Sequence, residues 1–344
     1  MLTKDQVVEL LQKVQDPILH KSITIRDVKT KEGYVSVKVA LAQTESAEQM
    51  KVQQEIVNTL KGAGAESVGL RFEQLADEEL PEGTSANPDL PPLLSPESKT
   101  QFIAVASGKG GVGKSTVTVN LATSLARLGK KVGIIDADIY GFSVPDMMGI
   151  ETRPKVENEK IYPVERFGVK VMSMAFFVED NAPVIWRGPM LGKMLNNFFS
   201  EVDWGELDYL LLDLPPGTGD VALDVHTMLP ASKEIIVTTP HATAAFVAAR
   251  AGAMALKTKH EVLGVVENMS YFESKVTGER EYVFGQGGGD KLASELSTDI
   301  LGRLPLGQPD FDEAEFAPSV YQEEHPIGMQ YLQIANEIIK RTAE

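Results

Sequence analysis

A glycine-rich run with two lysines constrains the fold of this chain more than any other feature of the sequence. Its residues are Gly108-Lys109-Gly110-Gly111-Val112-Gly113-Lys114-Ser115-Thr116, and they fit the pattern G-x-x-x-x-G-K-S/T. A short apolar run, Phe102 to Ala106, comes before it, and a helical stretch, Ser115 to Leu128, follows it. A strand, a glycine loop and a helix in this order are typical of a phosphate-binding loop.

The residue types in this loop suit a nucleoside triphosphate and its magnesium ion, ATP being the expected ligand. The glycines let the backbone wrap inward so that successive N–H groups point at phosphate oxygens, and the helix N-terminus adds its positive dipole. We expect Lys114 to contact the β and γ phosphates and the Ser115 hydroxyl to bind Mg²⁺. The alternative, a chance glycine-rich turn, leaves the strand, the lysine and the hydroxyl unexplained. The predicted nucleotide-binding residues of the loop are Gly108, Lys109, Gly110, Gly111, Val112, Gly113, Lys114, Ser115 and Thr116.

Strand-like and helical runs alternate after residue 101. The helical stretches include Ser115 to Leu128 and the alanine-rich run Ala242 to Lys257. This order predicts an α/β domain with a mostly parallel sheet and helices on both faces, whose ligands bind at the carboxyl ends of the strands. The predicted strands are Phe102 to Ala106, Lys131 to Ile135, Tyr209 to Leu212, Glu234 to Thr238 and Val262 to Val266.

Two of these strands end in carboxylates, which are costly in an apolar setting unless they meet a cation or hydrogen-bond donors. We expect Asp213 to hold magnesium through water and Asp138, two residues beyond Asp136, to orient the attacking water. The run from Gly217 to Gly219 is interpreted as a switch loop that senses the γ-phosphate. Capping of a helix or turn is the alternative role for Asp138 and Asp213.

The clearest shift in composition lies between Leu80 and Thr100. The chain has 344 residues, which is enough for two domains. Residues 81–100 are rich in proline and predict a semi-stiff linker. Residues 1–80 predict a small α/β domain without a catalytic constellation, interpreted as a docking or regulatory module. Residues 101–344 hold the nucleotide-binding domain. In the small domain we expect helices over 5–14 and 47–61 and strands over 34–39 and 68–72.

Charge and cysteine content exclude several classes of function. The formal net charge of −16 argues against broad attraction to nucleic acid or to an anionic membrane. The chain has no cysteine, which rules out disulfides, cysteine nucleophiles and iron–sulfur clusters ligated by its own thiolates. No signal peptide or membrane span is visible, so a cytoplasmic protein without a membrane partner is expected. The five histidines are scattered and form no metal-binding set.

The early lysine of the loop gives it a distinctive form. The run Lys109-Gly110-Gly111-Val112-Gly113-Lys114 resembles the deviant Walker A loop of the MinD, ParA and nitrogenase-iron-protein class. The resemblance implies a homodimer closed over two nucleotides, in which Lys109 reaches the partner's phosphates and assists catalysis together with Lys114 and Asp138. It also implies that Asn268, after the strand Val262 to Val266, bonds the adenine edge, although Asn268 could equally be a turn residue.

Longer motifs match one family within that class. The motifs are Asp136-Ala-Asp-Ile-Tyr-Gly-Phe-Ser-Val-Pro145, Trp186-Arg187-Gly188-Pro189-Met190, Asp213-Leu-Pro-Pro-Gly-Thr-Gly-Asp220 and Val265-Val266-Glu267-Asn268-Met269-Ser270-Tyr271. On these motifs the whole chain resembles the Mrp (ApbC) family of ATP-binding iron–sulfur cluster carriers, and its small domain resembles one shared with iron–sulfur targeting factors. For Trp186-Arg187-Gly188-Pro189, an interface role and plain loop packing both stay open.

One departure from the family pattern affects the expected function. Carriers of this family have a Cys-x-x-Cys after the Asn-Met-Ser-Tyr run, whereas here Ser274 and Thr277 occupy those positions. Hydroxyls are poor ligands for iron beside bridging sulfide, so no iron–sulfur cluster is expected. The pattern resembles the SalA-like regulatory branch of the family. We therefore expect a homodimeric, Mg-ATP-hydrolysing switch, regulatory in role and with a DNA or protein partner; the alternative is an iron–sulfur cluster carrier.

Overall fold

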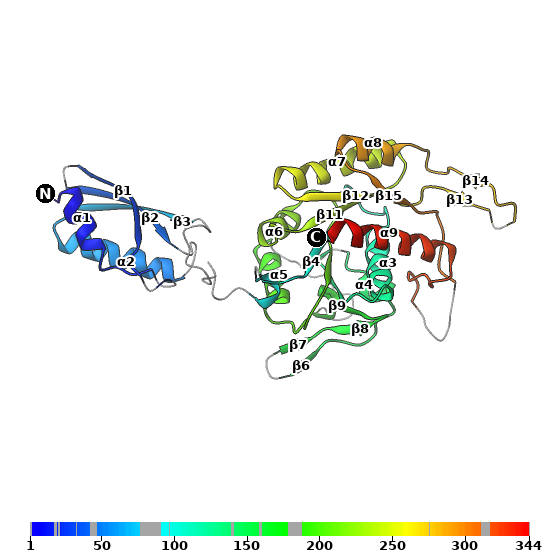
Figure 1. Cartoon of the computed structure of the whole chain (residues 1–344), viewed down its shortest axis with the longest axis horizontal. Coiled ribbons are helices and arrows are strands. Elements are labelled where there is room, and N and C mark those ends of the chain that lie inside the picture. The colour runs from blue at the N-terminus through cyan, green and yellow to red at the C-terminus, as the bar shows by residue number, and fades with distance from the viewer. Residues whose placement is uncertain are drawn as a thin grey trace. The chain divides into compact units, whose positions relative to one another are not determined.

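The chain is described by a computed structural model that divides into two compact units, Met1–Pro91 and Pro92–Glu344 (Figure 1). Residues 81–90 of the predicted linker lie outside the described residues. The structure describes the whole chain apart from residues 1, 17, 18, 20, 32, 42–46, 76–90, 96, 139, 140, 158, 159, 178–187, 275, 311–316 and 344.

The first unit packs two helices, α1 (Lys4–Leu11) and α2 (Ala47–Gly62), on a three-stranded sheet. The strands lie in the order β1 (Thr24–Lys31), β2 (Tyr34–Leu41), β3 (Ser67–Gln74), with β1 antiparallel and β3 parallel to β2. Alternate valines of β2 are buried, as its sequence pattern predicts. Strand β1 is an element that the sequence analysis does not predict, because polar residues interrupt its alternation. Its pairing with β2 shifts register between Ile25 and Asp27.

The second unit is built on an eight-stranded sheet, in which only β8 runs antiparallel to its neighbour. The predicted α/β fold with a mostly parallel sheet is therefore confirmed. The strands, in their order across the sheet, are β15 (Ile300–Arg303), β12 (Glu261–Glu267), β11 (Lys233–Thr238), β4 (Gln101–Ser107), β10 (Tyr209–Asp213), β5 (Val132–Asp136), β9 (Val169–Ser173) and β8 (Val164–Arg166).

Helices cover both faces of this sheet (Figure 1). The helices of this unit are α3 (Lys114–Arg127), α4 (Val144–Met147), α5 (Gly188–Ser200), α6 (Asp220–Met228), α7 (Ala242–Lys257), α8 (Gly288–Glu295), α9 (Pro326–Thr342), η2 (Pro92–Leu94) and η3 (Met174–Phe177). One apolar core joins the sheet to α5, α6, α7 and α8, and a second core joins it to α3, α4 and α9.

Two short antiparallel hairpins lie outside the main sheet. They are formed by β6 (Lys155–Glu157) with β7 (Lys160–Tyr162) and by β13 (Phe272–Glu273) with β14 (Arg280–Glu281).

Strand register brings the predicted chemistry to one edge of the sheet. Strand β10 lies between β4 and β5, and Asp213 at its end is level with Val105 and Asp136. The glycine-rich loop leaves β4 just beyond Val105, so loop and carboxylates meet although they are far apart in the sequence.

Candidate functional site

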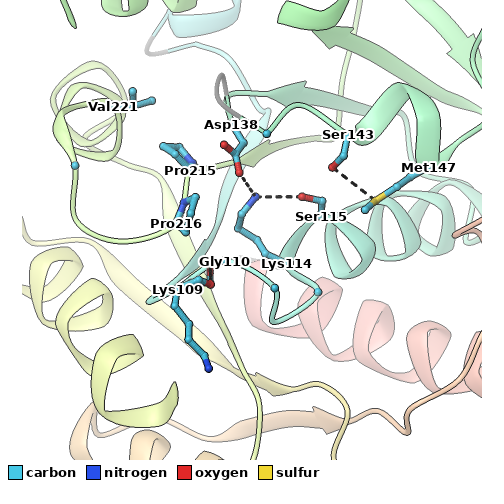
Figure 2. A pocket seen from close by; sticks show the side chains of 15 residues that line it. Lys109, Gly110, Lys114, Ser115, Asp138, Ser143, Met147, Pro215, Pro216 and Val221 are labelled. Atoms are coloured by element: carbon cyan, nitrogen blue, oxygen red, sulfur yellow. Dashed lines mark hydrogen bonds and ion pairs between the residues drawn. The ribbon is translucent and has the colours of Figure 1, made fainter. Parts of the chain in front are cut away.

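The glycine-rich loop forms one wall of a cavity of about 680 Å³ at the carboxyl ends of β4, β5 and β10 (Figure 2). Gly113 adopts a left-handed conformation, φ 83°, just before α3 begins at Lys114. A side chain at Gly108 would meet the backbone of α7, since a Cβ there would lie 2.2 Å from Ala248 N. Both glycines are therefore required by the path of the loop. The cavity is lined by Ser107, Lys109, Gly110, Gly111, Gly113, Lys114, Ser115, Asp138, Gly141, Ser143, Met147, Pro215, Pro216, Gly219 and Val221.

The structure brings the predicted lysine, hydroxyl and carboxylates into direct contact. Lys114 Nζ lies 2.7 Å from Asp213 Oδ2 and 3.7 Å from Asp138 Oδ2. Ser115 Oγ donates to Asp213 Oδ2 at 2.6 Å, and Thr118 Oγ1 donates to Asp213 Oδ1 at the same distance. Asp213 is fully buried, so the Lys114 ammonium compensates a charge that solvent does not reach.

This donor set fits magnesium. A hydroxyl and a carboxylate oxygen are hard ligands, and Mg²⁺ is commonly held by one or two protein groups together with phosphates and water. Ser115 and Asp213 would hold the ion, which would neutralise phosphate charge during hydrolysis. In the described part of the chain, no group of three or more His, Asp or Glu side chains is placed to enclose a metal by itself. Such an enclosure is not needed for a nucleotide-bound magnesium ion.

Asp136 is a site residue that the sequence analysis does not assign a role. It is fully buried, and its Oδ2 accepts from Ser173 Oγ at 3.0 Å, Ser143 N at 3.2 Å and Val144 N at 3.3 Å. These bonds fix the loop after β5, which carries Asp138. Burial and the nearby charge of Asp213 raise the pKa of Asp136 to about 7. Its place at the end of a buried strand, level with Asp213, is the signal that could have identified it.

The raised pKa of Asp136 predicts a pH-dependent stability. The unfolded chain ionises this carboxyl at its ordinary pKa, so the folded state loses stability as pH rises from about 4 to about 7. Asp136→Asn removes the titration and keeps one acceptor oxygen. From pH 5 to pH 8, its unfolding free energy relative to the parent should therefore rise by on the order of 1–3 kcal/mol. Urea unfolding of the variant and the parent at both pH values measures this difference in unfolding free energy. A difference that is the same at pH 5 and at pH 8 would contradict the raised pKa of Asp136.

Asp138 and Lys109 occupy different parts of the site. Asp138 faces the cavity and is partly buried, and burial is the main cause that raises its pKa, opposed by the Lys114 ammonium. Lys109 is exposed, and Figure 2 shows its side chain directed away from Lys114 and Asp138. Lys109 thus lines the cavity, but its ammonium is directed away from Lys114 and Asp138 of its own chain.

The predicted switch loop and the remaining motifs are placed as follows. Gly217 donates its N–H to Ser107 O at 2.8 Å, which ties the loop after β10 to the end of β4. Helix α6 starts directly after Gly219.

Asn268 lies at the end of β12 and donates to Val112 O at 2.9 Å. Its predicted adenine contact stays a prediction. Trp186 and Arg187 lie outside the described residues, and α5 begins at Gly188.

Comparison with known proteins assigns the chain to a family. The sequence model of the ParA group described as NUBPL iron-transfer P-loop NTPase matches residues 98–339. The chain belongs to this family. The family and the site geometry together show a P-loop ATPase, as the sequence predicts.

Two relatives that are similar over nearly the whole chain share one name. The iron–sulfur cluster carrier protein of Bacillus subtilis (strain 168) is 66% identical over 344 residues, 98% of each chain. The protein of the same name from Mycobacterium leprae (strain TN) is 40% identical over 98% of this chain and 93% of its own.

Solved structures support the same fold. A nucleotide-binding protein from Archaeoglobus fulgidus in complex with ADP is 41% identical, with a TM-score of 0.53, and covers 68% of this chain and 87% of its own. The cell division ATPase MinD of Pyrococcus furiosus is 22% identical, with a TM-score of 0.51, and covers 70% of this chain and 99% of its own. The MinD structure shows the fold alone.

These findings overturn the expected regulatory function. The sequence analysis favours a regulatory switch because Ser274 and Thr277 replace two cysteines, yet the close relatives are named iron–sulfur cluster carriers. The alternative, a carrier ATPase, is the better supported interpretation. The regulatory prediction was wrong because one pair of ligand positions does not determine the role of the whole protein.

The two hydroxyls have local structural partners in the β13–β14 hairpin. Ser274 Oγ accepts from Val276 N at 3.3 Å and from Thr277 N at 3.2 Å, and Thr277 Oγ1 accepts from Glu279 N at 3.3 Å. Ser274 and Thr277 thus stabilise the turn between the two strands.

None of the helices in the described ranges combines the length and hydropathy that crossing a bilayer requires.

Proposed function

We propose that this ATPase serves iron–sulfur cluster transfer and couples Mg-ATP binding and hydrolysis to movement of the cluster. The observation that carries the proposal is the intact site, in which Lys114, Ser115 and Asp213 are in contact, in a chain 66% identical to a named cluster carrier. The 98% coverage of both chains supports a shared function for the whole protein.

The side chains of this protein do not fit a cluster held by it alone. Clusters of this kind are held by thiolates or, at some positions, by imidazoles, and the chain has no cysteine. At the hairpin, Ser274 and Thr277 offer hydroxyls that already accept backbone hydrogen bonds. We propose that the thiolates come from a second molecule, either a client protein or a small thiol, and that this chain contributes the ATPase.

Cluster transfer can be tested directly with the full chain. The donor is a [2Fe–2S] cluster ligated by glutathione, the acceptor is an apo-ferredoxin, and the mixture is kept anaerobic. We expect the acceptor to be loaded faster with the chain and Mg-ATP than with the chain and Mg-ADP, as followed by the visible absorption of the acceptor. A loading rate that is the same with and without the chain would refute the proposal.

We further propose that two copies close over their nucleotides and that Lys109 contacts the phosphates bound by the partner. Exposure of Lys109 and the direction of its side chain support this role, because a lysine so placed is available to a second molecule. Its ammonium would then stabilise the charge that develops on the transferred phosphoryl group.

Lys109→Ala should leave the protein monomeric with ATP and lower ATP turnover by about 10²–10³-fold, since one transition-state cation is lost. Light scattering with ATP and with ADP measures association, and phosphate release measures turnover. Lys257→Ala, at the exposed C-terminal end of α7, is the matched control and should behave as the parent. ATP-dependent association that persists in Lys109→Ala would exclude the role in trans.

A further inference from the structure

Asn268 connects the end of β12 to the phosphate-binding loop. Its Nδ2 donates to Val112 O at 2.9 Å across a sequence separation of 156 residues. The carbonyl oxygen can only accept, so the amide orientation follows from the partner. Asn268 is 7% exposed as a residue, and a Cβ on Gly113 would lie 2.1 Å from Nδ2. The amide is thus packed directly against the loop.

The bond from Asn268 has a consequence for phosphate binding. The Val112 carbonyl and the Gly113 N–H belong to one planar trans peptide, so they point in opposite directions. Holding the carbonyl toward Asn268 directs the Gly113 N–H away from Asn268. Gly113 lines the cavity and begins the turn into α3. The orientation of this N–H decides whether it can donate to a phosphate oxygen.

The backbone around Asn268 is fixed on both sides. Its own N–H donates to Thr238 O at 2.8 Å, and Met269 holds a left-handed φ of 53°. The buried carboxylate of Glu267 accepts from Ser270 Oγ at 2.6 Å and from Gly289 N at 2.7 Å. Left-handed backbone at a residue other than glycine persists where surrounding contacts enforce it. The turn therefore supplies a rigid base for the Asn268 amide.

We infer that Asn268 is a positioning residue for phosphate binding, which fixes the Val112–Gly113 peptide so that its N–H faces the nucleotide phosphates. This role concerns every nucleotide with the same phosphates, whatever its base. It differs from the predicted adenine contact, which would concern ATP and ADP alone. It depends on the ATPase site only and is independent of the proposed cluster transfer.

The test measures dissociation constants of the full chain and Asn268→Leu, a neutral variant of similar size without the donor. The probes are Mg-ATP, Mg-GTP and inorganic tripolyphosphate, which has no base. We expect all three to bind about tenfold more weakly, as the loss of one hydrogen bond to the loop implies, with the ratio of ATP to GTP affinity unchanged. The control Asn336→Leu loses an exposed amide bond to Leu332 O of 2.9 Å on α9 and should bind as the parent.

Two other results would overturn the inference. Weaker ATP binding with unchanged GTP and tripolyphosphate binding would assign Asn268 to adenine recognition. Unchanged binding of all three probes together with a lower melting temperature would leave Asn268 a purely structural residue. Neither result would bear on cluster loading of the acceptor, so the two proposals can fail separately.

Discussion

Replacement of Lys114 by methionine is expected to lower the rate of ATP hydrolysis by about 10²–10³-fold, the usual effect of removing one preorganised charge. The Lys114 ammonium lies 2.7 Å from the buried carboxylate of Asp213. Without it, this carboxylate loses the ammonium that compensates its charge, and the unfolding free energy should fall by about 3–5 kcal/mol. Phosphate release measures the first effect and urea unfolding the second.

A matched control shows whether the effects of Lys114→Met depend on the position of this lysine or follow from the loss of any lysine. Lys131 pairs with Glu206, but both side chains are exposed, so Lys131→Met should have little effect on stability and leave ATP turnover unchanged. ATP turnover of Lys114→Met equal to that of the parent would show that another group neutralises the phosphates.

Replacement of His226 by leucine should destabilise the second unit by about 3–5 kcal/mol, because Glu234 would lose its close partner. His226 Nε2 lies 2.5 Å from Glu234 Oε1, both side chains are buried, and Glu234 Oε2 has no hydrogen-bond partner among the described residues. Thr258 Oγ1 lies between His226 Nδ1 and His260 Nδ1, at 3.0 and 2.9 Å, so the network also joins α6 to the end of α7.

Calorimetry of the full chain measures this effect as a fall of roughly 6–20 °C in the melting temperature of the second unit. The double variant His226→Leu/Glu234→Leu should recover much of the loss, because it also removes the unpaired carboxylate. Lys160→Met, which breaks an exposed contact of 3.3 Å to Asp203, is the control and should have little effect. An unchanged melting temperature in His226→Leu would show that Glu234 is compensated by other means.

Local patterns predicted the elements with strong periodicity. The predicted helix Ala242 to Lys257 coincides with α7, and the short apolar runs from 102 to 266 correspond to β4, β5, β10, β11 and β12. These segments are buried on one stripe or on both faces, so their composition reports their environment. Strands β8 and β15 are short and partly exposed, and the sequence analysis does not predict them.

Contacts between distant segments explain the residues that sequence reasoning assigned incompletely. Asp136 belongs to the site because β5 lies beside β10, and this pairing is set by the sheet as a whole. The contact of Asn268 with Val112 depends in the same way on the return of β12 to the edge where the loop begins. No spacing within a single motif contains either piece of information.

The sequence by itself determined that a phosphate-binding loop follows a buried strand, because its glycines, Lys114 and Ser115 form a continuous local pattern. The sequence also predicted Asp213 as a magnesium ligand. Only the tertiary structure decided the contacts of the loop: Asp213, 98 residues from Ser115, accepts from the Ser115 hydroxyl beside Lys114, and Asn268 holds the Val112 carbonyl. The physical reason is that backbone conformation follows from neighbouring residues, whereas partners for buried charges and amides are brought together only by the packing of the whole sheet.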